Sequence, residues 1–262
     1  MSHFCRPPLD ANPRSGLGSA LDERSLERNR VRKIGLIGGL SWYSTKTYYE
    51  HIQHGVQARR GKQASAPMLI ESLDFSHLVR LSSEEDWTRA AEVLAASARR
   101  LEAAGATALI IGANSMHKVQ DKVAAAISIP LIHIAECTAT RMAEKGVRRA
   151  ALIGTRNVMV EGFWRRRLIA RDIELLPPDM DSVATLDRII YDELMQGKAS
   201  RQSERELKTI MVALQQAGAQ AVVLGCTELE MIVDVDANVL PIYDSTRIHA
   251  EAAAEWILGG QS

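Results

Sequence analysis

Residues 105–114, GATALIIGAN, have a close counterpart in residues 218–227, GAQAVVLGCT, which begin 113 positions later. In both segments a short and continuously apolar run precedes a glycine, a pattern typical of a parallel strand covered on both faces. The residue after that glycine differs, because the first segment has Ala113 and the second has Cys226. One half of the chain therefore offers a thiol where the other offers only a methyl group.

Two further pairs of segments repeat in the same order, residues 37–39 with 153–155 and residues 129–132 with 240–243. Apolar strand-like runs alternate with amphipathic helices, including helices from Ser83 to about Gly105 and from 203 to 217, and this alternation predicts parallel sheets. The predicted strands are 33–37, 67–72, 108–111, 130–134, 149–153, 173–176, 221–224 and 240–243. We therefore predict an α/β fold of two pseudo-symmetric domains, each a roughly four-stranded parallel sheet flanked by helices, with an active-site cleft between them.

The repeat also predicts the domain boundaries. A first α/β domain is expected over residues 33–146 and a second over 147–245, with a C-terminal helix at 246–258 that packs back on the first domain. Residues 1–32 are polar and contain several prolines and glycines. We expect a flexible N-terminal extension there, with a short helix at 22–29.

Composition excludes several function classes. Lys and Arg together number 32, as do Asp and Glu, so the formal net charge is zero and no basic field attracts nucleic acid or anionic lipid. No apolar run approaches the ~18 residues of a membrane span, and no hydrophobic signal core opens the chain. Cys5, Cys137 and Cys226 have no metal-binding spacing, and no dinucleotide or Walker motif is present. We expect a cytoplasmic protein that binds no metal or cofactor.

Cys226 lies between a predicted strand and a predicted helix start at residues 227–230. Free N–H groups and the helix dipole at such a place favour the thiolate, so a depressed pKa is expected. The alternative is an ordinary buried apolar cysteine. Thr227 and Glu228 add a hydroxyl and a carboxylate at the same strand end, although Glu228 could instead cap the helix.

Asn114 and Ser115 occupy the matching strand end of the first half. With free backbone amides they could hold a carboxylate, or they could serve as a routine helix N-cap. His117 and Lys118 fall in the next helical turn and could lie on the surface. Gly38 and Gly39 follow the first strand and would allow the backbone to approach a ligand closely.

Three segments in combination resemble the aspartate/glutamate racemase family: residues 34–42 (IGLIGGLSW), 114–118 (NSMHK) and 225–229 (GCTEL). The resemblance covers about residues 33–258. It implies a cofactor-independent racemase with two α/β domains, a homodimer, acting on aspartate, glutamate or a related amino acid. It also implies a two-base mechanism, in which one cysteine removes the α-proton and another delivers a proton on the opposite face.

By motif position Cys226 is one catalytic thiol. The substrate-binding residues that the resemblance and the strand ends indicate are Leu40, Ser41, Asn114, Ser115, Thr155, Thr227 and Glu228. Arg59 is a weaker match to a basic residue of the family's first domain.

Ala113 departs from the family, whose first catalytic cysteine, or threonine in some members, stands immediately before the asparagine. Three interpretations follow. Ala113 could be an engineered replacement of that acid/base residue. It could be natural, with a one-base reaction at Cys226 in which water, His117 or Ser115 assists, as in single-cysteine decarboxylase-like lyases. The chain could also bind an amino acid or dicarboxylate without turnover.

Overall fold

The computed structural model describes residues 31–74, 76, 78, 80–234 and 238–259. The helix predicted at 22–29, and all but the last two residues of the predicted N-terminal extension, lie outside this range. From Arg32 onward the chain forms one compact unit.

The first sheet contains three parallel strands in the order β2-β1-β3. These are β1 (Ile34–Gly38), β2 (Met68–Ser72) and β3 (Ala108–Ile111). Every residue of β1 and β3 is buried, as expected for strands covered on both faces. The sheet is thus built around the apolar run from which the sequence predicted it.

The second sheet repeats this plan with four parallel strands in the order β5-β4-β6-β7. These are β4 (Arg149–Gly154), β5 (Glu174–Leu175), β6 (Ala221–Gly225) and β7 (Ile242–Asp244). The first strand of each set is central and is flanked by the next two along the chain. The predicted α/β fold with two similar parallel sheets is therefore confirmed.

The strand predicted at 130–134 is wrong. Leu131 makes only an isolated parallel bridge to Leu109, so the first sheet has three strands rather than four. At Ile134 the chain already begins helix α5 (Ile134–Glu144), because Nδ1 of His133 accepts the backbone N–H of Ala135 at 3.1 Å and caps the helix.

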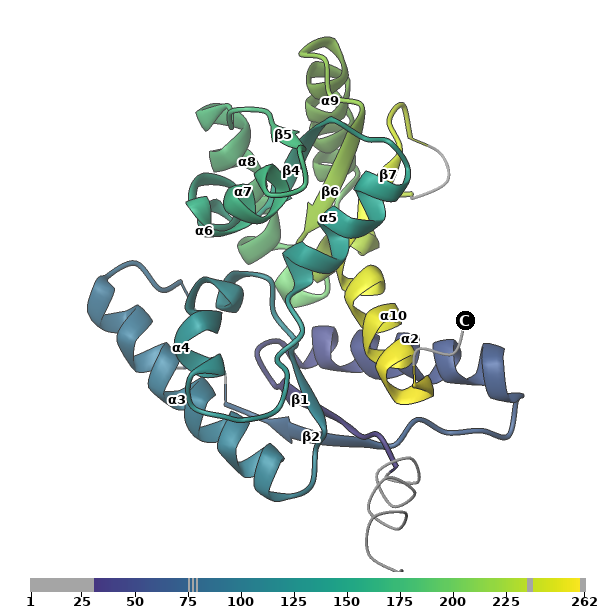
Figure 1. The fold of residues 1–262 in the computed structure, drawn as a ribbon. Helices are drawn as coiled ribbons and strands as arrows, with labels where there is room; N and C mark the ends of the chain where they lie inside the picture. Colours follow the sequence, from purple (N-terminus) through teal and green to yellow (C-terminus); the bar gives the residue numbers. More distant parts are fainter. Residues whose placement is uncertain (1–30, 75, 77, 79, 235–237, 260–262) are drawn as a thin grey trace, which may run out of the picture. The chain divides into compact units, whose positions relative to one another are not determined.

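Helices cover both sheets (Figure 1). The predicted helix after Ser83 is confirmed by a capping box with Asp86, and Ser200 caps the helix predicted near 203–217. The remaining bounds are α2 (Trp42–Arg60), α3 (Glu84–Ala103), η2 (Ser115–Val119), α4 (Gln120–Ala124), α6 (Arg156–Val160), α7 (Gly162–Ile169), α8 (Met180–Asp192), η3 (Leu194–Gln196), α9 (Arg201–Gln216), η4 (Thr227–Met231) and α10 (Ser245–Leu258).

The last helix, α10, connects the two sheets. It leaves the end of β7 in the second sheet and packs beside α2, which covers the first sheet (Figure 1). Ala253 and Ile257 join Tyr48 and Ile52 in one buried apolar cluster. Hydrogen bonding between the Tyr48 hydroxyl and Nδ1 of His249, at 2.8 Å, adds a polar contact inside this interface. Within the described residues, no helix has the length and apolar character required to cross a bilayer.

Candidate active site

One pocket brings together nine of the residues that the sequence analysis associated with catalysis or substrate binding. Those residues are Leu40, Ser41, Ala113, Asn114, Ser115, Thr155, Cys226, Thr227 and Glu228. They follow the carboxyl ends of β1, β3, β4 and β6, the edge at which parallel sheets bind ligands. Because these strands come from both sheets, each sheet contributes one side of the pocket.

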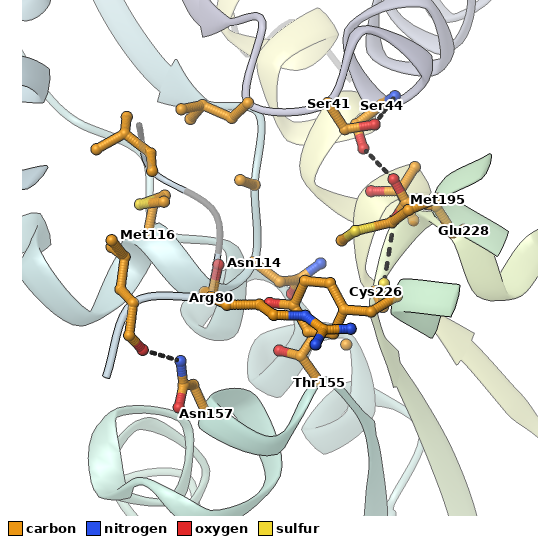
Figure 2. Close-up of a pocket in the computed structure, with 18 of the residues that line it drawn as sticks. Ser41, Ser44, Arg80, Asn114, Met116, Thr155, Asn157, Met195, Cys226 and Glu228 are labelled. Carbon is orange, nitrogen blue, oxygen red and sulfur yellow. Dashed lines mark hydrogen bonds between the residues drawn. The ribbon is translucent and has the colours of Figure 1, made fainter. Parts of the chain in front are cut away.

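Cys226 is joined to a buried carboxylate. Its Sγ donates a hydrogen bond to Oε2 of Glu228 at 3.1 Å, and Oε1 of Glu228 accepts from the Ser44 hydroxyl at 3.2 Å. All three residues are buried. Figure 2 shows them as a continuous chain of hydrogen bonds that reaches from α2 to the end of β6. Glu228 is therefore a partner of the thiol rather than a helix cap.

The expected depression of the Cys226 pKa is wrong. Burial is the largest cause, and the negative charge of Glu228 the next, and together they raise the pKa of this thiol well above its usual value. The predicted helix start at 227–230 is only a 3₁₀ helix over Thr227–Met231, too short to supply much of a dipole. The resting form of Cys226 is consequently the neutral thiol, hydrogen-bonded to a carboxylate.

Ala113 occupies the corresponding place after β3. Its methyl group packs against the apolar cluster of the first sheet, which includes Leu40 and Met116. Ala113 has no side-chain group that could exchange a proton. The two sides of the pocket thus have similar backbones and different chemistry.

Two buried polar atoms of the pocket have no hydrogen-bond partner within the described part of the chain. They are Nδ2 of Asn114 and Oγ1 of Thr155. Neither side chain caps the helix that follows it, although both occupy N-cap positions. The Asn114 side chain is held from its other end, where Oδ1 accepts from the Ser245 hydroxyl at 3.2 Å. Unpaired buried donors are costly, so these two atoms are suited to a bound ligand.

The glycine that follows β1 allows a close contact within the protein rather than with a ligand. Gly39 has a φ of +74°, and a Cβ there would lie 2.1 Å from the backbone oxygen of Leu73. The close approach predicted for this loop is thus to the neighbouring chain segment. It positions Leu40 and Ser41, where Ser41 caps α2 by accepting the backbone N–H of Ser44.

Several residues that line the pocket escaped the sequence analysis, among them Ser44, Arg80 and Tyr191. Arg80 has a φ of +52°, pairs with Asp192 at 2.7 Å, and lies over the ring of Tyr191 at 4.7 Å. Figure 2 shows its side chain extending across the pocket. None of them belongs to a local sequence motif, so their place beside the pocket becomes visible only after folding.

His117 and Arg59 do not line this pocket. His117 is buried beside His133 and His249, its Nδ1 lies 2.5 Å from Oε1 of Gln120, and burial lowers its pKa to about 4. The alternative of a surface His117 is therefore wrong, and its suggested assistance in proton transfer has no support here. Arg59 lies in the last turn of α2, far along the helix from Ser44.

Comparison with known proteins identifies the family. The sequence model of the Asp/Glu/hydantoin racemases matches residues 37–253. The chain belongs to this family. A protein from Yersinia pestis with a provisional Asp/Glu racemase name is 38% identical, with a TM-score of 0.81 over 87% of this chain and 99% of that one.

Other relatives agree with this assignment. An aspartate racemase homologue from Pyrococcus horikoshii OT3 is 29% identical, with a TM-score of 0.76 over 87% of this chain and 99% of that one. The broad specificity amino-acid racemase RacX of Bacillus subtilis is 20% identical over 87% of this chain and its own full length. The chain is accordingly an isomerase of the amino-acid racemase type by family, built on the family's two-sheet α/β fold.

Proposed function

We propose that the chain transfers the α-proton of a small amino acid of the aspartate/glutamate type on one face only, with Cys226 as its acid/base group. The observation that carries the proposal is the buried Cys226–Glu228–Ser44 hydrogen-bond chain facing a pocket whose other strand end presents Ala113. Family membership supports the reaction class, and the asymmetry of the pocket supports the restriction to one face.

Glu228 is proposed to accept the proton of the Cys226 thiol, so that the thiolate can act as a base despite the high pKa of the thiol. When substrate binds, the Sγ–H bond breaks and the proton moves along the existing 3.1 Å hydrogen bond to Oε2. The thiolate then takes the α-proton, and the electron pair left on Cα delocalises into the substrate carboxylate. The reverse transfer from the thiol restores the Cα–H bond on the same face. The Ser44 hydrogen bond holds the carboxylate in place throughout.

Asn114 and Thr155 are proposed to bind the substrate carboxylate. Their unpaired Nδ2 and Oγ1 atoms are buried, and the two residues line one pocket, Asn114 after β3 and Thr155 after β4. Hydrogen bonds from such preorganised groups stabilise the charge that builds up on the carboxylate as the α-proton leaves. The Thr227 hydroxyl lies 3.3 Å from that of Thr246, so it is oriented by a neighbour before substrate arrives.

On the other face, Ala113 can neither donate nor accept a proton. An amino acid deprotonated by Cys226 therefore regains its proton from Cys226, and its configuration is kept. We expect exchange of the α-proton with solvent, through Glu228, to outpace inversion.

The test of Cys226 is α-proton exchange in D₂O, followed by NMR with aspartate and glutamate. We expect Cys226→Ala to slow exchange about 10²–10⁴-fold, the usual contribution of a general acid/base. Cys137→Ser is the matched control, because Cys137 is the other described cysteine and lies in α5 outside the pocket. Exchange that persists in Cys226→Ala would contradict the proposal, and binding without exchange in the unaltered chain would favour a binding protein.

We also infer a cytoplasmic homodimer, as the family resemblance implies. Light scattering after gel filtration should give twice the monomer mass of 28.8 kDa. A monomer at the concentrations of the activity assay would contradict this inference.

A further inference from the structure

We propose that His51, Glu230 and Asp244 bind a divalent transition-metal ion at a site separate from the pocket. Each residue offers one ligand atom, and these atoms all lie within 4.8 Å of one another. His51 comes from α2, Glu230 from η4, and Asp244 from the junction of β7 and α10. None of the three lines the active-site pocket.

Two of the ligand atoms are buried and lack a hydrogen-bond partner among the residues that the structure describes. Nε2 of His51 and Oε1 of Glu230 lie 3.8 Å apart, beyond hydrogen-bond length. A buried polar atom without a partner destabilises the folded state. A metal ion between these two atoms would satisfy both at once.

The distances suit a metal. Zinc bonds to imidazole nitrogen and to carboxylate oxygen are about 2.0–2.2 Å long, so two ligands of one ion lie at most about twice that distance apart. The 3.8 Å between Nε2 of His51 and Oε1 of Glu230 already falls within this range, and all three ligand atoms lie within 4.8 Å of one another. One imidazole with two carboxylates favours zinc and its neighbours over magnesium.

The Asp244 carboxylate is fixed in position because it caps the N-terminus of α10. Its Oδ1 accepts the backbone N–H groups of Thr246 and Arg247 at 2.9 and 3.1 Å, so the carboxylate cannot swing away. The Arg247 side chain forms an ion pair with Glu251, with Nε 3.4 Å from Oε1.

A metal here would fix the relative positions of three elements that form the active site. α2 carries Ser44, η4 carries Glu228 two residues before Glu230, and α10 carries Ser245, the partner of Asn114. We therefore expect a structural role, in which the ion holds the loop after Cys226 against the first sheet. Positions 51, 230 and 244 show no local spacing, which explains why the sequence did not indicate the site.

The experiment uses the full chain, stripped of metal with a chelator and then titrated with Zn²⁺ by calorimetry and thermal unfolding. We expect one ion per chain and a rise in Tm, because an ion that binds only the folded state stabilises it. His51→Gln and Glu230→Gln should each weaken binding by at least about tenfold. His54→Gln is the matched control, since His54 is an exposed histidine on the same helix.

Asp244→Asn separates folding from binding, because asparagine caps a helix as well as aspartate does. This variant should keep the metal-free Tm of the parent and lose most of the zinc affinity. Unchanged zinc affinity in His51→Gln would overturn the proposal. If Cys226→Ser also lost zinc binding, the ion would belong to the active-site pocket instead. An absence of binding by the unaltered chain would overturn it as well.

Discussion

The ends of β3 and β6 have similar backbone structures but carry different side-chain groups. Each strand is apolar, buried and parallel to the central strand of its sheet, and a glycine, Gly112 or Gly225, follows the apolar run. After that glycine, one end carries Ala113 and the other Cys226. The two strand ends therefore share their backbone arrangement and differ in their functional groups.

The difference extends past this one position. In the register of the repeat, Ser115 is the counterpart of Glu228, so the first sheet has a hydroxyl where the second has the carboxylate that accepts from Cys226. Thiol and carboxylate are thus both confined to the β6 side. Replacing Ala113 with cysteine would therefore supply the thiol of this pair and not its carboxylate.

The largest expected effect comes from placing a thiol at both strand ends. Ala113→Cys should increase racemisation at least about 10²-fold, because a second acid/base group becomes available on the opposite face. The measurement is the optical rotation of aspartate or glutamate followed over time from each pure enantiomer.

Ala113→Ser is the control for this change, since serine is close to cysteine in size but its hydroxyl is a poor acid and base near neutral pH. An equal gain in both variants would mean that polarity rather than a thiol was missing. No gain in Ala113→Cys would contradict the assignment of position 113 to the opposite face.

A smaller effect concerns the carboxylate present at only one strand end. Burial and the charge of Glu228 raise the pKa of Cys226, so removing the charge with Glu228→Gln should lower that pKa. The midpoint of the alkylation rate against pH should therefore move down by about one unit. Deuterium exchange should nevertheless slow by about tenfold or more, since the proton acceptor is gone.

Ser44→Ala is the matched comparison, because it removes the hydroxyl that holds the Glu228 carboxylate and leaves the charge. Its alkylation midpoint should stay close to that of the parent. A midpoint that rises in Glu228→Gln would show that the carboxylate does not oppose ionisation of the thiol.

The smallest effect tests how similar the two strand ends are in packing. A Cβ at Gly225 would lie 2.7 Å from Cγ1 of Val158 and 3.1 Å from the Ile153 oxygen, whereas the nearest atom at Gly112 would be 3.2 Å away. Gly225→Ala should cost about 1–3 kcal/mol of unfolding free energy, as overpacked sites do, and Gly112→Ala less. Urea unfolding measures both, and an equal loss would contradict the stated difference in packing.

Much of the fold was predictable because its causes are local. Apolar runs such as 108–111 and 221–224 become buried parallel strands, and the glycines after them mark the pocket edge. The strand expected at 130–134 failed because the His133 side chain caps a helix there, a choice that the apolar pattern does not reveal.

The site was predictable where it follows strand ends and unpredictable where it depends on distant contacts. Asn114 and Cys226 belong to motifs, and both line the pocket. Ser44 is near Glu228 only through folding, since 184 positions separate them. The pKa of Cys226 was predicted in the wrong direction because a short helix's dipole is weaker than full burial beside a carboxylate.

The most direct test of one-sided proton transfer is the ratio of exchange to inversion. A single enantiomer of the substrate is incubated in D₂O with the unaltered chain, and deuterium at Cα and chirality are measured on the same samples. The account predicts that one enantiomer gains deuterium with its configuration retained, at least about 10²-fold faster than it inverts. Equal rates of deuterium gain and inversion from both enantiomers would contradict it.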